Sequence, residues 1–274
     1  MAKFVYKFSA MSTPCEVILY THDKSKADSV ARSILNEAKR LEKKYNYYDT
    51  YSYLSQINLR STKELDNESK SLLKRAKEYY IKTNGVFDIT IATIKNLYTE
   101  LNSLEDLKLQ KSKLSQYVGC EHFEIKKNKI VFDNEYTKID LGGFVKEYAV
   151  DRAVTIIKKN KIDSALINYG GDIYALGVKP NNEMFKVGIK NPANPSLKEV
   201  EVELQDQALT TSASYERNYT IQAKTFSHIL SKDKNASISG SVSVISSDCV
   251  ESGVYSTSLM LDKNIKTENK IIVL

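Results

Sequence analysis

Cysteine is scarce in this chain, which has only three in its 274 residues: Cys15, Cys120 and Cys249. They lie far apart in the sequence, and none belongs to a Cys-Xaa-Xaa-Cys pair. The sequence therefore indicates neither a zinc site nor a disulfide framework. We expect all three cysteines to be buried and reduced.

The sequence also lacks long apolar runs. None approaches the roughly 20 residues that a membrane-spanning helix needs, and residues 1–15 show neither the apolar stretch nor the cleavage site of a signal peptide. We expect no membrane span, and a cytoplasmic protein as the chain stands or a periplasmic one if an export signal has been removed. No repeat or linker marks a domain boundary, and 42% hydrophobic residues are enough for a proper core.

Basic runs interleaved with aromatic residues are absent as well. The 40 Lys and Arg residues exceed the 34 Asp and Glu residues by a net charge of +6, but they are spread along the sequence. This distribution is typical of a solvated, lysine-rich surface and excludes an obvious nucleic-acid groove. It supports only a modest preference for anionic ligands.

The periodicity of apolar residues predicts an α+β protein. One segment, residues 103–114, reads as a polar connector. Helices are predicted at residues 24–44, 69–83 (stopped by Asn84-Gly85), 91–101, 145–158 and 253–261. Strands, mostly short and antiparallel, are predicted at residues 5–9, 16–21, 124–126, 129–132, 164–167, 173–177, 185–190, 200–204, 219–222, 241–245 and 271–274.

Two glycine pairs stand at the ends of strand-like runs, each with a carboxylate beside it. They occur in the segments DLGGFVK, residues 140–146, and NYGGD, residues 168–172. A glycine pair allows positive φ and close approach of the backbone to a ligand, and a helix that follows aims free N–H groups at an anion. The pairs suggest a nucleotide phosphate site. The pattern matches neither a P-loop nor a dinucleotide-binding fingerprint.

These pairs belong to an ordered set of short motifs that covers nearly the whole chain. The motifs are MST at 11–13, SYLSQIN at 52–58, GVFDIT at 85–90, DLGGFVK at 140–146, ALINYGGD at 165–172, TS at 211–212, HI at 228–229 and ST at 256–257. In this order the sequence resembles the ApbE family, the FAD:protein FMN transferases. The resemblance implies an ApbE-like (T-fold-like) α+β domain with antiparallel sheets flanked by helices, formed by residues 1–274 as a single domain.

The resemblance also implies an activity. Members of the family bind FAD in an elongated cleft, use Mg²⁺ to break its pyrophosphate, and attach FMN to a threonine or serine of an acceptor flavoprotein with release of AMP. Such phosphoryl transfer requires neutralisation of the pyrophosphate, an in-line arrangement of the two oxygens and removal of a hydroxyl proton.

Several residues match positions that contact FAD in the family. Met11 forms an apolar wall of the pocket or belongs to the core. Tyr48 stacks on the flavin or lies in a surface loop. Val86, Phe87 and Asp88 contact FAD through an exposed aromatic and a carboxylate, or they form a glycine-capped turn with a core phenylalanine and an N-cap aspartate.

The glycine motifs supply further candidates by resemblance. Asp140 binds a hydroxyl or base edge of FAD, or it caps a helix. Lys146 lies near the phosphates, where the helix dipole disfavours a merely structural cation. The carbonyl of Gly143 is a metal ligand. Gly170 and Gly171 shape the cleft, although a tight turn explains them equally well.

The last candidates lie near the C-terminus. His228, followed by Ile229 in the flavin-binding set, is the candidate for phosphate binding or proton transfer, and a structural histidine is the alternative. Thr257 is expected to bind the metal together with an aspartate four residues earlier on the same helical face. At that position this chain has Gly253.

The departure at Gly253 leaves a metal only a hydroxyl and a carbonyl, unless Asp248 or Glu251 reaches in. A second departure places Glu147 where the family has a glycine, which adds negative charge near the expected phosphate path. A third replaces the family's Ser-Gly-Asp by Ser212-Ala213-Ser214. Magnesium is therefore in doubt.

Three hypotheses follow from the sequence. The first is an active FMN transferase, with FAD as substrate and a flavoprotein as acceptor. The second is a flavin-binding protein with weak or no catalysis. The third is a non-catalytic interaction protein built on a degenerate transferase scaffold.

Overall fold

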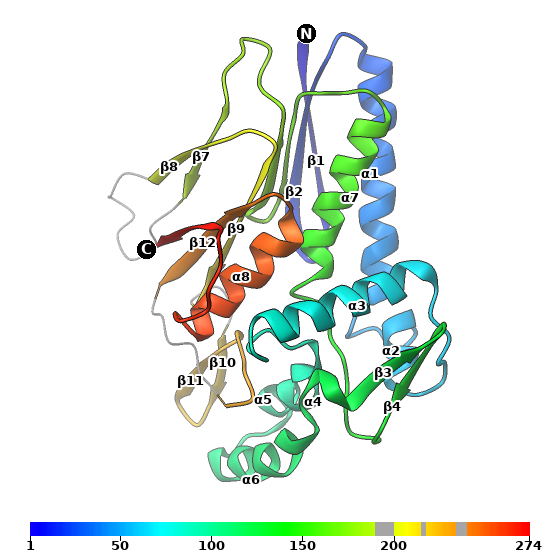
Figure 1. The fold of residues 1–274 in the computed structure, drawn as a ribbon, viewed down its shortest axis with the longest axis vertical. Helices are drawn as coiled ribbons and strands as arrows, with labels where there is room; N and C mark the ends of the chain where they lie inside the picture. Colours follow the sequence, from blue (N-terminus) through cyan, green and yellow to red (C-terminus); the bar gives the residue numbers. More distant parts are fainter. Residues whose placement is uncertain (190–199, 215–217, 234–239) are drawn as a thin grey trace.

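The computed structural model describes residues 1–189, 200–214, 218–233 and 240–274 (Figure 1). Its centre is a seven-stranded sheet with the order β1-β2-β5-β6-β9-β12-β13, in which every neighbouring pair is antiparallel. The strands are β1 (Ala2–Ala10), β2 (Thr13–Thr21), β5 (Ala165–Tyr169), β6 (Asp172–Leu176), β9 (Gln207–Ala213), β12 (Ser241–Ser246) and β13 (Lys270–Val273).

Three helices cover one face of this sheet: α1 (Lys24–Tyr45), α7 (Val145–Lys159) and α8 (Cys249–Leu261) (Figure 1). Their apolar stripes and the inward side chains of the strands form the main core. Helix α8 is buried along almost its whole length, because it packs on β9 and β12 and also beside α7. Helix α7 lies between α1 and α8 and packs against both.

Strand β6 is buried on both faces of the sheet. Tyr174 and Leu176 point into the main core, whereas Ile173 and Ala175 belong to a second apolar cluster on the opposite face. The second cluster is closed by a hairpin of β7 (Phe185–Ile189) and β8 (Val200–Leu204). The run of apolar residues in β6, which is continuous after Asp172, is what a strand buried on both sides requires.

The remaining elements lie beyond the lower ends of the helices in Figure 1. These elements are α2 (Tyr53–Asn58), α3 (Asn67–Lys82), η1 (Ile89–Ile91), α4 (Ala92–Lys95), α5 (Leu97–Glu100), α6 (Leu104–Leu114), η2 (Ser115–Tyr117), η3 (Cys120–His122), β3 (Phe123–Lys126), β4 (Lys129–Phe132), β10 (Asn218–Ile221) and β11 (Lys224–Ser227). A third apolar cluster is formed by residues of α4, α5, α6 and the β10–β11 hairpin, where the Tyr98 ring contacts Tyr219 and Phe226.

The α+β class and the antiparallel arrangement predicted from the sequence are confirmed. The polar connector predicted at residues 103–114 is wrong, because α6 occupies it with Ser103 as its N-cap. That helix is largely solvent-exposed and buries only Leu107, so its sequence carries little apolar periodicity. The helix predicted at residues 91–101 is broken into η1, α4 and α5. Lys190, the end of one predicted strand, lies outside the described residues.

The three cysteines are buried and free, as expected. Among the described residues, no helix combines the length and the apolar character that crossing a membrane requires.

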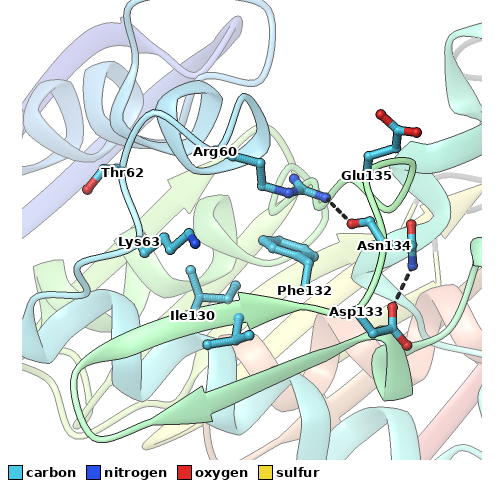
Figure 2. A pocket seen from close by; sticks show the side chains of 9 residues that line it. Arg60, Thr62, Lys63, Ile130, Phe132, Asp133, Asn134 and Glu135 are labelled. Atoms are coloured by element: carbon cyan, nitrogen blue, oxygen red, sulfur yellow. Dashed lines mark hydrogen bonds between the residues drawn. The ribbon is translucent and has the colours of Figure 1, made fainter.

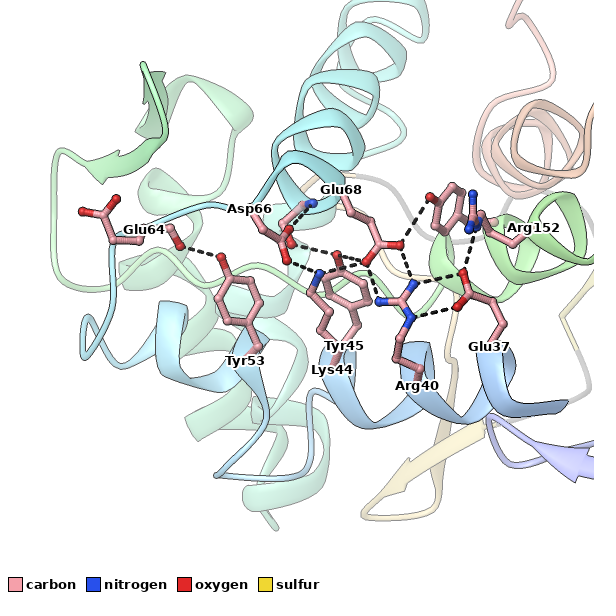
Figure 3. Close-up of polar contacts among 11 residues, drawn as sticks. Glu37, Arg40, Lys44, Tyr45, Tyr53, Glu64, Asp66, Glu68 and Arg152 are labelled. Carbon is pink, nitrogen blue, oxygen red and sulfur yellow. Dashed lines mark hydrogen bonds and ion pairs between the residues drawn. The ribbon is translucent and has the colours of Figure 1, made fainter. Parts of the chain in front are cut away.

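A network of ion pairs along α1 fastens α3 and α7 to it (Figure 3). Arg40 donates two hydrogen bonds to the carboxylate of Glu68 at the start of α3, at 2.6 and 2.9 Å, and Lys44 adds a third at 2.8 Å. Glu37 binds both Arg40 and Arg152 of α7, each at 2.8 Å. Bidentate, partly buried pairs of this kind orient helices better than isolated surface pairs.

Glu68 accepts hydrogen bonds from both Arg40 and Lys44 and so links two cations of this network. Burial acts to raise its pKa, but the hydrogen bonds from Arg40 and Lys44 outweigh burial and lower the pKa from 4.5 to about 2. Because the pKa of Glu68 is lower in the folded than in the unfolded protein, its carboxylate stabilises the fold fully at pH values above the unfolded pKa of 4.5. This contribution is lost as the pH falls from about 4.5 towards about 2.

We predict that Glu68→Gln lowers the free energy of unfolding at pH 7 by about 1–2 kcal/mol, a value discounted for the partial exposure of the pair. Urea unfolding at pH 7 and at pH 3 measures it, and the difference between variant and wild type should shrink at pH 3. The matched control is Glu64→Gln, because Glu64 pairs with Lys129 in full solvent and should change stability by less than about 0.5 kcal/mol. Equal losses in the two variants would contradict the assignment.

Candidate functional site

The first glycine motif forms the turn that leads into α7. The Asp140 carboxylate accepts a hydrogen bond from the N–H of Gly142 at 2.8 Å and pairs with Lys95 Nζ at 2.5 Å. It does not cap α7: the N-cap residue is Phe144, and no side chain bonds to the helix there. The alternative that Asp140 caps the helix is therefore wrong. No side chain caps α7, and the N–H of its first residue, Val145, donates to the carbonyl of Leu141 at 2.8 Å.

An ion pair joins the two glycine motifs. Lys146 Nζ, in the first turn of α7, lies 2.7 Å from Oδ2 of Asp172, the residue that follows the second glycine pair. Asp172 is almost completely buried at the start of β6. The two segments are separated by the length of α7 and β5 in sequence, and this contact brings them together in space.

The second glycine pair forms the tight turn between β5 and β6. Gly170 and Gly171 have φ values of +61° and +100°, and their N–H groups donate to the Pro14 carbonyl at 3.0 Å and to Asn168 Oδ1 at 2.8 Å. A Cβ atom on Gly170 would lie 1.9 Å from Oγ1 of Thr13. The close approach of two turns, at residues 11–13 and 170–171, therefore requires glycine at position 170.

Met11 lies in the turn between β1 and β2, in the left-handed region of φ at +53°. Its N–H donates to Oε1 of Glu42 on α1 at 2.6 Å, and its side chain packs against the main core. Met11 thus lies at the same end of the sheet as the second glycine turn.

Tyr48 is largely exposed and lies beside Lys95, whose Nζ atom is 4.9 Å from the centre of the Tyr48 ring. Because Lys95 also pairs with Asp140, it connects the tyrosine loop to the turn before α7. Burial lowers the pKa of Lys95, but Asp140 outweighs this and raises it, so Lys95 is a permanent cation here. Sequence reasoning missed Lys95, and no local motif marks it.

Residues 86–88 match one of the two alternatives given for them. Phe87 is buried, with its ring centre 5.8 Å from that of Phe144, so the alternative of an exposed aromatic is wrong. Val86 is buried as well, and Asp88 is the N-cap of η1, accepting from the N–H and the hydroxyl of Thr90 at 2.8 and 2.6 Å. Burial raises the pKa of Asp88. These contacts are those of the structural alternative, a turn with a core phenylalanine and an N-cap aspartate.

His228 and Ile229 follow β11. His228 is half-buried, and Ile229 is buried in the main core with its N–H donating to Ser227 Oγ at 3.2 Å. The hairpin that carries them is attached to the body of the protein through the Tyr98 ring contacts of α5.

Glu147 lies directly against Gly253, across the contact between α7 and α8. A Cβ atom on Gly253 would lie 2.6 Å from Cγ of Glu147 and 3.2 Å from its Oε1. The side chain of Glu147 is therefore directed at α8, the helix that carries Thr257. Burial, followed by the charge of Asp172, raises the pKa of Glu147 well above its usual range.

Thr257 lies one turn beyond Gly253 on α8. Its Oγ1 is 3.1 Å from Oγ of Ser212 on β9, which also contacts the Ser256 hydroxyl at 2.8 Å. The hydroxyls of the Ser212 and Ser256-Thr257 motifs are thus brought together, although neither motif is near the other in sequence.

Asp248 and Glu251, the alternative ligands considered above, have other surroundings. Asp248 is the N-cap of α8, where it accepts from the N–H of Glu251 at 2.9 Å, and it also pairs with Arg75 at 2.6 Å. Within the residues that the structure describes, no three Asp, Glu, His or Cys side chains are grouped to hold a metal ion.

A cavity lies at some distance in sequence from these residues, between the loop after α2 and the β3–β4 hairpin (Figure 2). In it the guanidinium of Arg60 lies 3.7 Å from the centre of the Phe132 ring and donates to the carbonyls of Asn134 and Thr137. None of the residues predicted to bind FAD or metal lines this cavity. We therefore assign it no part in the site.

Comparison with known proteins identifies the family. A sequence model described as the ApbE family matches residues 11–269, so the chain belongs to that family. A relative named FAD:protein FMN transferase from Klebsiella pneumoniae (strain 342) is 26% identical over 268 residues, covering 93% of this chain and 82% of the relative. One of the same name from Vibrio cholerae (serotype O1, strain O395) is 24% identical over 264 residues, covering 89% and 77%.

Solved structures agree with this assignment at the level of the fold. The ApbE protein of Thermotoga maritima matches with a TM-score of 0.86 at 23% identity, over 99% of this chain and 94% of that one. The flavin transferase ApbE of Vibrio cholerae matches with a TM-score of 0.82 at 18% identity, over 99% and 97%. The ApbE-like fold expected from the motifs is confirmed.

The glycine turn gives a matched pair of variants. Gly170→Ala places a Cβ atom on Thr13 as well as forcing alanine into positive φ, and we predict a loss of about 2–4 kcal/mol in the free energy of unfolding. Gly171→Ala meets no atom within 4 Å and should lose only the backbone component, about 1–2 kcal/mol. Guanidinium unfolding of both variants measures the difference. If Gly171→Ala lowers the free energy of unfolding as much as Gly170→Ala does, the contact with Thr13 does not explain the need for glycine at position 170.

Proposed function

We propose that this chain is an FAD:protein FMN transferase, which moves FMN from FAD to a threonine or serine hydroxyl of an acceptor flavoprotein and releases AMP. The observation that carries the proposal is the Lys146–Asp172 ion pair. It holds a lysine and both glycine turns beside the start of α7, where no side chain caps the helix, an arrangement suited to a diphosphate. The names of the sequence relatives support the same activity.

The site residues then have the following roles in the proposal. Asp140 accepts hydrogen bonds from FAD with Lys95 beside it, and Tyr48 stacks on the flavin. Lys146 faces the pyrophosphate, while Gly170 and Gly171 allow the backbone to approach the ligand closely. Because Val86 and Phe87 are buried and Asp88 caps a turn, we propose that residues 86–88 support the cleft through the backbone and the core.

The chemical step is a phosphoryl transfer with a defined balance. The acceptor hydroxyl oxygen bonds to the phosphorus of the FMN half, the bond from that phosphorus to the bridging oxygen breaks, and AMP leaves with the electron pair. The hydroxyl loses a proton, for which we propose His228 as the acceptor, since an imidazole titrates near neutral pH. A divalent cation, when bound, would neutralise the charge that develops on the phosphates.

One observation favours a second function. Gly253 offers no carboxylate on α8, and without a replacement the protein would bind FAD but transfer FMN slowly or not at all. A transferase would attach FMN covalently to an acceptor protein, whereas a flavin-binding protein would not.

Mass spectrometry of an acceptor flavoprotein incubated with FAD, Mg²⁺ and this protein tests the proposal. We predict covalent FMN on a threonine or serine, and a rate reduced about 100-fold by Lys146→Met, in line with the loss of one charged group that stabilises a transition state. Lys158→Met, an exposed lysine of the same helix, is the matched control and should leave the rate unchanged.

The two remaining outcomes distinguish the alternatives. FAD binding without covalent transfer would leave a flavin-binding protein. Absence of FAD binding, in a protein shown by its unfolding curve to be folded, would refute both flavin functions. Because Lys146→Met leaves Asp172 buried without its lysine, the variant's stability must be measured beside its rate.

A further inference from the structure

Glu147 is a buried carboxylic acid with an unsatisfied oxygen. The residue is 6% exposed, and its Oε2 atom has no hydrogen-bond partner. A buried carboxylate without a counter-charge costs several kcal/mol, so such groups are normally neutralised, paired or bound to a metal. A partner for this oxygen is therefore expected in the working protein.

The lysine next to it does not fill that role. Lys146 Nζ contacts Asp172 at 2.7 Å, and Asp172 is itself close enough to repel a charge on Glu147. Asp151, one turn further along α7, accepts from the first N–H groups of α8 and is a further acidic residue. Acidic residues therefore outnumber the one lysine among these groups at the α7–α8 contact.

Two further residues with oxygen atoms that could bind a cation lie four positions from this contact: one from Glu147 on α7, the other from Gly253 on α8. Gly143 is four residues before Glu147 at the entrance to α7, and open space surrounds the position of its missing side chain. Thr257 is four residues after Gly253, on the same face of α8. Its hydroxyl is held by Ser212 at 3.1 Å and keeps a lone pair for another partner.

We propose that the carboxylate of Glu147 is the anionic ligand of a divalent-cation site, completed by Oγ1 of Thr257 and the carbonyl of Gly143. Carboxylate, hydroxyl and carbonyl oxygens are the donors that hard cations such as Mg²⁺ and Mn²⁺ prefer. The site contains a single protein carboxylate, which is common for Mg²⁺ that is also bound by substrate phosphates.

This assignment explains the two departures from the family pattern, Gly253 and Glu147, as a single exchange of the carboxylate between two helices. The carboxylate missing from α8 at Gly253 is supplied across the helix contact by Glu147 of α7. The exchange must be reciprocal, because any Cβ atom at position 253 would lie 2.6 Å from the Glu147 side chain. Glu147 therefore requires glycine opposite it, and the charge near the phosphate path becomes a ligand for the cation.

The inference deepens the proposed function, since the cation would act on the FAD pyrophosphate, but its test needs neither FAD nor an acceptor. Binding of Mn²⁺ to the free protein is followed by the loss of the electron paramagnetic resonance signal of hydrated Mn²⁺, and Mg²⁺ binding by titration calorimetry. We predict that Glu147→Gln weakens both by at least about tenfold, because even residues that only support metal ligands contribute 10–100-fold.

Asp151→Asn is the matched control. Asp151 is also a carboxylic acid of α7, but its Oδ1 and Oδ2 already accept from the N–H groups of Cys249 and Val250, and asparagine keeps one of these two bonds through its amide oxygen. This variant should bind Mn²⁺ with unchanged affinity. A loss as large as that of Glu147→Gln would indicate a general effect of charge and would overturn the assignment.

The reciprocal exchange provides the sharpest variant. Gly253→Asp alone should be destabilised because its Cβ atom collides with Glu147, and Glu147→Gly alone should lose the cation. The double variant Glu147→Gly/Gly253→Asp should recover both stability and Mn²⁺ binding, with the carboxylate now on α8. Additive losses in the double variant would contradict the proposal.

The outcomes separate this inference from the proposed function. If the wild type binds FAD and transfers FMN, yet Glu147→Gln binds Mn²⁺ as well as the wild type, only the cation assignment fails. If Mn²⁺ binds through Glu147 but no acceptor is modified, the cation site stands and the transferase function fails. A wild type that binds no Mn²⁺ or Mg²⁺ overturns the inference outright.

Discussion

The close contact between α7 and α8 is the constraint on which the site depends. It exists because Gly253 has no side chain, which leaves room for Glu147 to lie on the backbone of α8. One turn further along α7, Asp151 accepts hydrogen bonds from the N–H groups of Cys249 and Val250 at 2.8 and 3.2 Å. Two acidic residues of one helix face thus fix the position of the other helix.

Ion pairs connect α7 to other parts of the protein on both sides of this contact. Lys146, adjacent to Glu147, reaches Asp172 and so fixes the second glycine turn relative to the first. On the other side of α7, Arg152 reaches Glu37 and through it the ion-pair network of α1 and α3 (Figure 3). Helix α7 therefore joins the candidate phosphate site to the outer helices, and a shift of α7 would disturb both.

Much of the fold was predictable, because apolar periodicity reports burial. The helices α1, α3 and α7 and most strands appear near their predicted positions, since each has a clear apolar stripe or alternation. Helix α6 was missed because it buries little more than Leu107. The ordered motifs predicted the family, since several short patterns in a fixed order are far more specific than any one of them.

The candidate site was predictable only in part. Sequence reasoning named Asp140, Lys146 and the glycine turns as candidates, but it missed the contacts of Lys95 with Asp140 and Tyr48, which depend on the packing of α4. For Phe87 it left an exposed ring and a core ring as alternatives, and only the structure shows that the ring packs on Phe144 in the core. It treated Glu147 and Gly253 as two separate losses, because adjacency across a helix contact is a property of tertiary structure.

The most direct test of this account is a crystal structure of the protein with Mn²⁺, in which anomalous scattering locates the ion. The account predicts an ion at the α7–α8 contact, bound by Glu147, Thr257 and the Gly143 carbonyl at about 2.0–2.3 Å, typical of hard cations with oxygen ligands. An ion bound elsewhere, or one held without Glu147, would contradict it.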